Sequence, residues 1–508
     1  MNNKRLIINM TANIISFVVT MGINFLLTPF IVNTVSKEAY GFVGLANNFV
    51  SYAQLITLAL NSMAGRFITI KIHQQDNEGA NKYFTSVIIA NTFTAILMLI
   101  PSILIVVFLD KIINVPQGIL VDVQLLWLFI FINFLFSIIV STFNVATFVT
   151  NRLDLSSIRD IQSNILKVIL LIIMFSFFSP AVWYIGLVTL ICTVFIGCYN
   201  IYYKKTLLPQ IKIKKKYFDL TIIKELLISG SWNVVTKLGQ ILSDGLDLLI
   251  SNLFIDAASM GVLAIAKTVP NAISNLMITI GGVFSPQFTI YYAKGDIEKL
   301  IEEIKLSMKI SGFFTNIPLG IMIVLGPAFY SLWVPGEDIE LLQRLSILIG
   351  YGLIISGVIN SLFGVFTITN KLKVNSLMIL GTGALNAVIV FILLKTTNLG
   401  ILAIAGVSTT TAVIKNLTFT PMYSAKCLGA SKKVFYPTLI RYIFSSIILI
   451  AIFIAIAGYI NVDGWIGMFL FAVVLGVIGL IINYIILLNS SERKYINSMI
   501  INKIKIMK

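Results

Sequence analysis

The stretch LIINMTANIISFVVTMGINFLLTPFIV, from Leu6 to Val32, contains no charged residue. A helix of about 20 apolar residues crosses the hydrocarbon core of a bilayer, which is roughly 30 Å thick. Similar runs follow almost to the C-terminus of the 508-residue chain, which is 58% hydrophobic and only 11% charged. Ordinary soluble domains are about 25% charged. The sequence therefore predicts an all-α integral membrane protein.

The apolar runs predict about fourteen transmembrane helices. The first run is too long for a signal peptide and no cleavage pattern follows it, so we expect it to remain as the first span. The predicted spans are 6–33, 40–65, 83–109, 118–149, 155–178, 181–203, 222–254, 258–290, 305–333, 341–369, 374–394, 398–425, 435–460 and 464–489.

The basic residues predict the orientation of these spans. If the N-terminus is cytoplasmic, most of the 37 Lys and Arg fall in the tails and the even-numbered connections. Only Lys37, Lys111, Arg344 and Lys395 then lie on the outer side. This bias follows the positive-inside rule. We expect a multi-pass protein of the cytoplasmic membrane with both termini inside, and its net charge of +16 favours contact with anionic lipid headgroups rather than nucleic acid.

The chain divides into two similar halves. Sliding the sequence by about 220 residues aligns span one with span seven, so that Asn13 meets Asn233, Gly41 meets Gly261 and Ala46 meets Ala266. Because six spans separate the copies, both enter the membrane in the same direction, as in a parallel repeat. The predicted parts are an N-lobe at 1–203, a basic linker at 204–221, a C-lobe at 222–428, and two further helices with a basic tail at 429–508.

Residue types exclude several kinds of chemistry. His73, the single histidine, lies in a predicted polar loop, and Cys192, Cys198 and Cys427 lie in or next to apolar runs where we expect them to be buried. Their spacing fits neither a metal site nor a disulfide framework. No connection is long enough for a nucleotide-binding domain, and there is no P-loop. We therefore predict no metal and no cofactor.

Charged residues inside the spans are the strongest functional candidates. Lys237, Lys267 and Lys415 lie deep in spans seven, eight and twelve, and Asp244 and Asp247 share one polar stripe of span seven with Lys237. A central charge facing lipid costs roughly 2.5 to 3.5 kcal/mol, so these groups must face a cavity or one another. Three lysines outnumber two acids, which favours an anion in a shared cavity, with the acids in ion coupling or in pairing with a lysine.

The first half supplies polar candidates with less charge. Asn13 on span one and Asn47 on span two lie on polar faces, and Arg66 follows span two near the expected cytoplasmic entrance. The alternative for the Asn, Ser and Thr positions is that they only join neighbouring helices by hydrogen bonds.

The N-terminal region resembles a known family. The carrying residues are Asn13, Phe25 to Phe30, Glu38-Ala39-Tyr40-Gly41, Asn48 to Tyr52 and Gly65-Arg66-Phe67. They resemble the polysaccharide flippases of the multidrug/oligosaccharidyl-lipid/polysaccharide exporter superfamily, with Val35-Ser36 in place of the family's usual Leu-Gly.

This resemblance implies two six-helix lobes, alternating access, and an undecaprenyl-pyrophosphate oligosaccharide as the cargo for a surface polysaccharide such as O-antigen or capsule. Lysines and Arg66 would then hold the pyrophosphate, while Asn13 and Asn47 would bind sugar hydroxyls. A polysaccharide polymerase and assembly proteins are further expected partners.

Three other functions stay open. They are a peptidoglycan-precursor flippase, a cation-coupled drug exporter of the same superfamily, and a membrane-embedded polysaccharide polymerase. A cavity for cationic drugs would be lined by acids, whereas lysines prevail here. A polymerase would need a large outer loop, which the predicted spans do not leave. We therefore expect a carrier rather than an enzyme.

Overall fold

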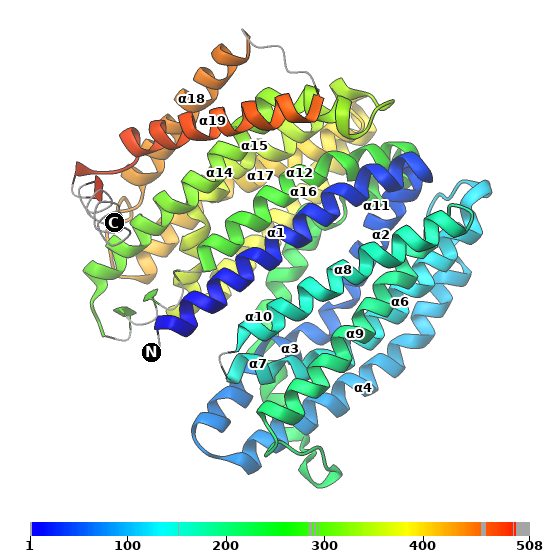
Figure 1. Ribbon diagram of the computed structural model, residues 1–508. Coiled ribbons are helices and arrows are strands. Elements are labelled where there is room, and N and C mark those ends of the chain that lie inside the picture. The colour runs from blue at the N-terminus through cyan, green and yellow to red at the C-terminus, as the bar shows by residue number, and fades with distance from the viewer. Residues whose placement is uncertain are drawn as a thin grey trace, which may run out of the picture. The chain divides into compact units, whose positions relative to one another are not determined.

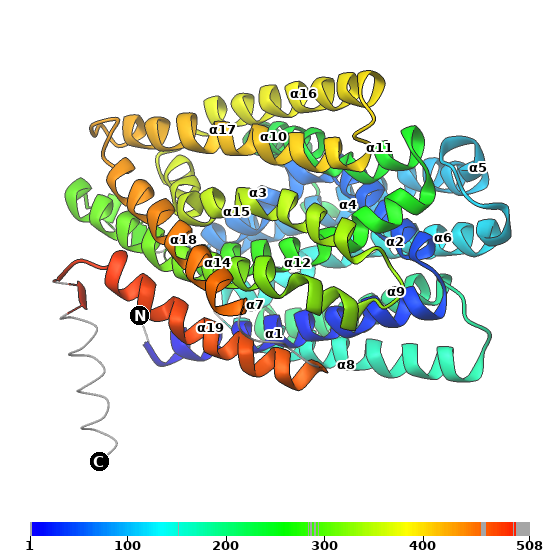
Figure 2. The ribbon, with the colours of Figure 1, turned by 90° about the horizontal axis from the view of Figure 1, so that it is seen from above.

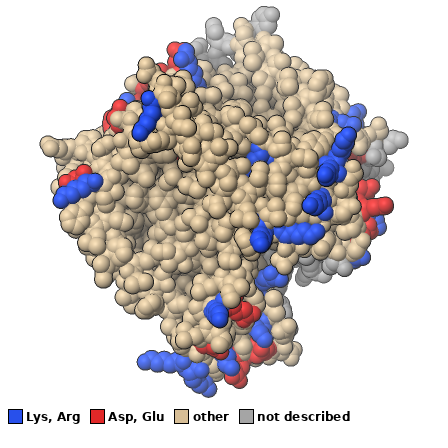
Figure 3. Space-filling view, turned by 180° about the vertical axis from the view of Figure 1, so that it is seen from behind, with Lys and Arg blue, Asp and Glu red and all other residues tan. Residues whose placement is uncertain are grey.

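A computed structural model describes residues 3–150, 152–282, 284, 287–288, 291–292, 294–458, 464–490 and 492–493. All regular elements in this part of the chain are helices. Twelve of them are long and apolar enough to cross a bilayer. The two remaining predicted spans are occupied by α1 (Asn3–Thr34) and by a broken helix made of α10 (Leu220–Gln240) and α11 (Asp247–Phe254). Figure 3 shows a broad area of one face nearly without charged side chains, as expected of a surface in contact with lipid. The chain is thus a multi-pass, all-α membrane protein.

The chain forms two compact units, and the first comprises Met1–Ile265 with Ile379–Ala384. Within it, α6 packs along α4 and α9, α8 packs against α1 and α9, and α3 packs against α4 and α10 (Figure 1). Its helices are α1 (Asn3–Thr34), α2 (Lys37–Ala53), α3 (Leu55–His73), α4 (Asn77–Val107), α5 (Leu109–Ile112), η1 (Gln117–Ile119), α6 (Leu120–Ser141), η2 (Thr142–Asn144), α7 (Val145–Val149), α8 (Leu153–Phe177), α9 (Trp183–Leu207), η3 (Lys215–Tyr217), α10 (Leu220–Gln240), η4 (Ile241–Gly245) and α11 (Asp247–Phe254).

The second unit comprises Ala266–Met378 with Leu385–Lys508. Here α15 packs against α14, α17 and α18, and α14 also packs against α19 (Figure 2). The helices are α12 (Ala257–Gly282), which begins in the first unit, α14 (Ile297–Trp333), α15 (Ile339–Ile368), α16 (Leu372–Thr396), of which Ile379–Ala384 belong to the first unit, α17 (Ile401–Cys427), α18 (Tyr436–Ala457) and α19 (Gly464–Ile486). The predicted division into lobes at 1–203 and 222–428 stays a prediction.

Three sequence expectations need correction. The second span is longer than predicted, so His73 is the last residue of α3 and not a loop residue. It is also broken at Gln54 into α2 and α3. Cys192 and Cys427 are buried as expected, but Cys198 is exposed.

The repeat reappears in the boundaries of the helices. α1 ends at Thr34 and α11 at Phe254, α2 begins at Lys37 and α12 at Ala257, and α4 begins at Asn77 and α14 at Ile297. The differences 254 minus 34, 257 minus 37 and 297 minus 77 all equal 220. The offset inferred from a few residue identities is therefore the offset of the helices themselves.

The caps of these helices repeat as well. Ser36 accepts a hydrogen bond from the amide of Ala39, and Asp256 accepts one from Ser259 in the equivalent place. Asp76 and Asp296 cap α4 and α14 in the same way, after Gln75 and Gly295 in the left-handed region at φ 61° and 72°. Outside the spans, hydrogen bonds from Lys71 and from Lys299 hold the pKa of Asp76 and of Asp296 below its usual range.

Equivalent glycines of the two copies touch each other. A Cβ built on Gly41 would lie 3.0 Å from the Cα of Gly261, and one built on Gly261 would meet the carbonyl of Lys37. One built on Gly44 would lie 3.9 Å from the Cβ of Ala264, again its equivalent. Contact between equivalent positions indicates a local two-fold relation between α2 and the first turns of α12. Only small residues permit so close an approach.

At three prolines of the second unit, Pro270, Pro327 and Pro421, the freed carbonyl finds a donor on another helix. Proline lacks the N–H that would bond to the carbonyl four residues earlier, and inside a bilayer no water replaces it. The three pairs are Ser346 Oγ to Ala266 O at 3.0 Å, before Pro270; Gln343 Nε2 to Ile323 O at 2.9 Å, before Pro327; and Tyr436 Oη to Leu417 O at 2.9 Å, before Pro421.

We predict that Gly261→Ala lowers the melting temperature of the purified protein. Its methyl group would meet the Lys37 carbonyl, and overpacking of this kind costs about 1–3 kcal/mol, more than the gain of up to about 1 kcal/mol from replacing glycine in a helix. Gly476→Ala on α19 is the control, because nothing lies within 4 Å of its Cβ position. A Gly261→Ala protein as stable as Gly476→Ala would contradict the close approach.

We also predict that Ser346→Ala destabilises the protein by about 1 kcal/mol, the usual scale of a side-chain hydrogen bond between membrane helices. The substitution removes the donor to the Ala266 carbonyl and also the hydroxyl that pairs with the buried Tyr330. Thermal unfolding in detergent measures the effect. Ser331→Ala is the control, since that exposed hydroxyl bonds only within its own helix, to Ala328. Equal stability of the two variants would show that the freed carbonyl needs no partner.

Candidate functional site

A cavity of about 580 Å³ lies in the first unit, between α3 and the region where α6 gives way to η2 and α7. Nearly all of its polar lining comes from uncharged amides and hydroxyls. The lining residues are Asn61, Ser62, Ala64, Gly65, Arg66, Ile68, Thr69, Ile70, Ser141, Thr142, Asn144, Val145 and Phe148.

The helix changes from α6 to the 3-10 turn η2 at Thr142, beside the cavity, and Asn91 of α4 stabilises this break. Asn91 is fully buried, and its NH2 group donates to the carbonyl of Ile138 at 3.2 Å and to the hydroxyl of Thr142 at 3.1 Å. The Ile138 carbonyl also accepts from Ser141 at 2.9 Å. These donors replace the N–H of Thr142, which bonds to Val140 instead. The helix can therefore tighten into η2 without leaving Ile138 unsatisfied.

The same amide fixes the wall of the cavity. Asn61 and Asn91 exchange two hydrogen bonds, at 2.9 Å and 3.3 Å. Ser62, next to Asn61, accepts a hydrogen bond from Asn233 of α10 at 3.1 Å. Hydrogen bonds between polar side chains thus join the cavity wall to α4 and α10. These residues therefore connect neighbouring helices, which is the alternative role considered for the Asn, Ser and Thr positions.

The remaining lining groups decide what the cavity can bind. The hydroxyls of Ser62, Thr69 and Ser141 donate to carbonyls of their own helices, so their oxygens can accept hydrogen bonds from a ligand. Arg66 is exposed and lines the cavity, and no ion pair within the described part of the chain involves it. Among the described lining residues none is acidic. The cavity therefore suits an anionic group attached to a hydroxyl-bearing one.

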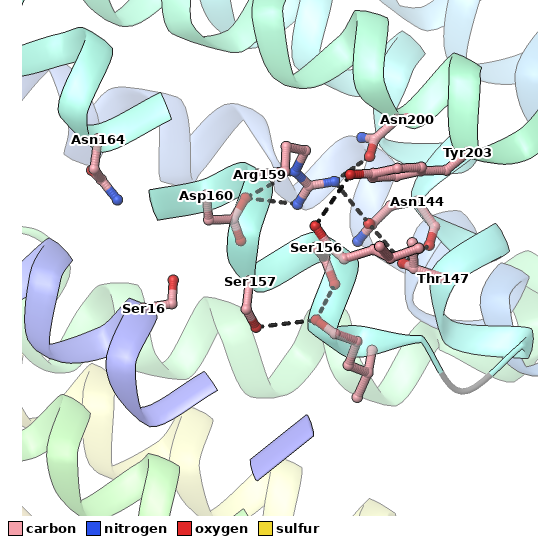
Figure 4. Close-up of polar contacts among 12 residues, drawn as sticks. Ser16, Asn144, Thr147, Ser156, Ser157, Arg159, Asp160, Asn164, Asn200 and Tyr203 are labelled. Carbon is pink, nitrogen blue, oxygen red and sulfur yellow. Dashed lines mark hydrogen bonds and ion pairs between the residues drawn. The ribbon is translucent and has the colours of Figure 1, made fainter. Parts of the chain in front are cut away.

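Arg159 of α8 contacts Asn144 of the cavity lining and is not among the candidates that the sequence singles out. Its side chain is buried, with an ion pair to Asp160 at 2.7 Å and hydrogen bonds to the side-chain oxygens of Asn144 and Asn200 (Figure 4). A signal was present: Arg159-Asp160 is a charged pair inside the predicted span 155–178.

The seventh span is broken where its two acids lie. Residues Ile241–Gly245 form a π-helical turn, and Tyr52 of α2 donates to the Gly245 carbonyl at 2.6 Å. The single polar stripe predicted for a regular helix is therefore wrong in this region. Asp244 is exposed, whereas Asp247 is only 3% exposed. π-helical turns often mark functional sites, and this one separates the two acids into different environments.

The predicted lysines lie on three helices. Lys237 is half-buried on α10 in the first unit, and Lys267 on α12 and Lys415 on α17 are half-buried in the second. The Lys415 ammonium lies 5.9 Å from the centre of the Phe363 ring. The cavity shared by these lysines stays a prediction, as do their contacts with a ligand.

The two predicted asparagines differ in what can be described. Asn47 is exposed on α2, where its NH2 group donates to the Val43 carbonyl of the same helix at 2.9 Å. Asn13 lies on α1, but its side chain is outside the described residues. Their sugar contacts remain a prediction.

Comparison with known proteins gives the family. A model for polysaccharide biosynthesis proteins matches residues 6–291, more than half of the chain. The chain belongs to this family. It is also 30% identical over 458 residues to the "uncharacterized membrane protein EpsK" of Bacillus subtilis (strain 168), covering 90% of each chain.

Solved transporters share the fold of this family member. It superposes with a TM-score of 0.66 and 14% identity on an inward-facing multidrug resistance MATE transporter of the MOP superfamily, covering 84% of this chain and 99% of the other. The TM-score is 0.65, with 16% identity, for the lipid II flippase MurJ in an inward closed conformation. That match covers 94% of this chain and 99% of MurJ. The resemblance seen in the sequence and the MATE/MurJ-like fold are thus confirmed.

We predict that the two acids of span seven differ in access to water. In a variant lacking the three native cysteines, Asp244→Cys should react with a charged methanethiosulfonate reagent at least about ten-fold faster than Asp247→Cys, since the thiolate must meet the reagent in water. Gln240→Cys, also exposed on this span, is the positive control. Equal labelling at 244 and 247 would contradict the separation made by the π-helical turn.

Proposed function

We propose that this protein is a flippase that carries undecaprenyl-pyrophosphate-linked oligosaccharide across the cytoplasmic membrane by alternating access, for surface polysaccharide synthesis. The observation that carries the proposal is the cavity beside Arg66, which pairs one unneutralised guanidinium with amides and hydroxyls and has no acid among its described lining residues. A pyrophosphate joined to a sugar presents the matching groups, namely anionic oxygens beside hydroxyls.

The family and the fold support this proposal from another direction. The chain matches the polysaccharide biosynthesis proteins, and its fold is that of transporters. The MurJ match includes more of the chain than the MATE match, 94% against 84%. MurJ carries lipid II, so this coverage favours a lipid-linked saccharide over a drug and makes a peptidoglycan-precursor flippase the second candidate.

The charged groups of the spans have roles in this proposal. Arg66 lies in the last two turns of α3, which in the proposed orientation, with both termini inside, is the cytoplasmic end, so it would meet the cargo on entry. Lys237, Lys267 and Lys415 would hold the pyrophosphate at depth, and Asn13 and Asn47 would bind sugar hydroxyls. Asp244 or Asp247 would couple transport to an ion.

The driving force and the partners complete the proposal. An inside-negative potential of 100 mV favours the outward movement of each net negative charge by about 2.3 kcal/mol. The sugar chain would then pass to a polymerase and assembly proteins, while anionic headgroups contact the exposed lysines of the linker, Lys212, Lys214, Lys215 and Lys216.

We predict that Arg66→Gln lowers the initial rate of translocation at least about ten-fold, because a hydrogen bond to a charged group contributes about 1.5–3 kcal/mol. The assay uses the full chain in proteoliposomes with a fluorescent undecaprenyl-pyrophosphate disaccharide. Arg344→Gln is the control, an exposed arginine that pairs with Glu340 far along the chain from the cavity. An initial translocation rate of Arg66→Gln equal to that of Arg344→Gln would contradict the proposed role of the cavity.

A further inference from the structure

Asn144 occupies a special position, because one side of its amide faces the cavity and the other faces a buried arginine. The residue is exposed and lines the cavity. Its side-chain oxygen accepts from Arg159 Nη1 at 3.2 Å and from Thr147 Oγ1 at 3.4 Å. No described residue accepts a hydrogen bond from its NH2 group.

Arg159 determines which end of this amide is free. A guanidinium has only donors, so the atom of Asn144 that faces it must be the oxygen. The NH2 group then points away from Arg159, and the exposure of Asn144 to the cavity makes that group a donor available to a ligand. Without Arg159, the amide could turn over and present its oxygen, which would repel an anion.

The charge of Arg159 is already balanced. Asp160 receives two hydrogen bonds from the guanidinium, at 3.0 Å and 2.7 Å (Figure 4). A buried and paired arginine adds little net charge to the cavity. Its effect on a ligand must therefore pass through the orientation of Asn144 rather than through direct attraction.

The repeat shows that the fold does not require this cluster. α8 begins at Leu153 after Arg152 at φ −113° and ψ 52°, and α16 begins at Leu372 after Lys371 at φ −107° and ψ 49°. With the two starts aligned, Met378 and Ile379 stand where the first copy has Arg159 and Asp160. The second copy thus builds the same helix start without a charged pair.

We propose that Arg159 is a positioning residue, which holds the NH2 group of Asn144 toward the cavity so that it donates to an oxygen of the anionic head of the ligand. The inference rests on the proposed function and deepens it by adding Asn144 to the ligand contacts. Asn200 provides a matched comparison, because its oxygen also accepts from Arg159 but it does not line the cavity.

The test measures how strongly the purified full chain prefers undecaprenyl pyrophosphate to undecaprenol, as the ratio of their Kd values in nanodiscs. Loss of folding would weaken the binding of both lipids, whereas loss of a phosphate contact would weaken only the binding of undecaprenyl pyrophosphate and so lower the preference for it. Two variants, Asn144→Asp and Asn200→Asp, keep an oxygen that accepts a hydrogen bond from Arg159. The third variant combines Arg159→Met with Asp160→Ile, which copies the second repeat and leaves no unpaired charge.

We expect the ratio to fall about ten-fold or more in Asn144→Asp and in the double variant, the effect of losing one hydrogen bond to a charged group, and to stay within about two-fold in Asn200→Asp. In an Asn144→Ala background, the double substitution should add no further loss, because its effect passes through Asn144.

The inference alone would be overturned by an unchanged ratio in Asn144→Asp, or by an equal fall of the ratio in Asn144→Asp and Asn200→Asp. Both results count only if the wild type prefers the pyrophosphate and the Arg66→Gln variant has lost that preference. A wild type with no preference for the pyrophosphate would overturn the proposed function as well.

Discussion

A carbonyl released from a helix inside a bilayer must find another donor, because no water is available to it. Five places in the described part of the chain meet that requirement with a side chain from elsewhere. The donors are Ser346, Gln343 and Tyr436 behind three prolines, Asn91 at the break before η2, and Tyr52 at the π-helical turn. At each of these five places the irregular turn occurs together with a donor from another part of the chain.

This constraint also explains where the candidate site lies. A regular helix uses all of its carbonyls internally and presents an even surface, whereas a break redirects side chains. The cavity opens beside η2, and Asp244 and Asp247 lie on either side of Gly245, whose carbonyl Tyr52 satisfies. Polar groups that join helices and groups that face a ligand are therefore neighbours: Asn91 holds the break, and Asn61, its partner, lines the cavity.

The spans and the repeat could be predicted from the sequence, because hydropathy and the 220-residue offset are properties of residues along one helix or at a fixed spacing. The family followed from the resemblance of particular residues, such as Glu38-Ala39-Tyr40-Gly41. The breaks could not be predicted. A helical wheel assumes a constant turn, and it placed Asp244 and Asp247 on one stripe because nothing local reveals that Tyr52, almost 200 residues earlier, bonds to Gly245. The charged pair Arg159-Asp160 was visible inside a predicted span, but its partners were not, since Asn144 and Asn200 come from neighbouring helices.

Many acidic side chains are engaged at helix ends, and Arg66 is the one charged residue among the described residues that line the cavity. Asp76, Asp219, Asp256, Asp296 and Asp338 cap the first turns of helices, and Asp122 of α6 accepts from the amides of Val182 and Trp183 where α9 begins. Each stabilises a helix end, where the free amides and the helix dipole favour a negative charge. Asp160 is held by Arg159. These carboxylates already have partners, whereas Arg66 in the cavity wall has no ion pair in the described part of the chain. Arg66 is thus the charged group among the described residues that line the cavity, and its natural complement is the anionic group of a ligand.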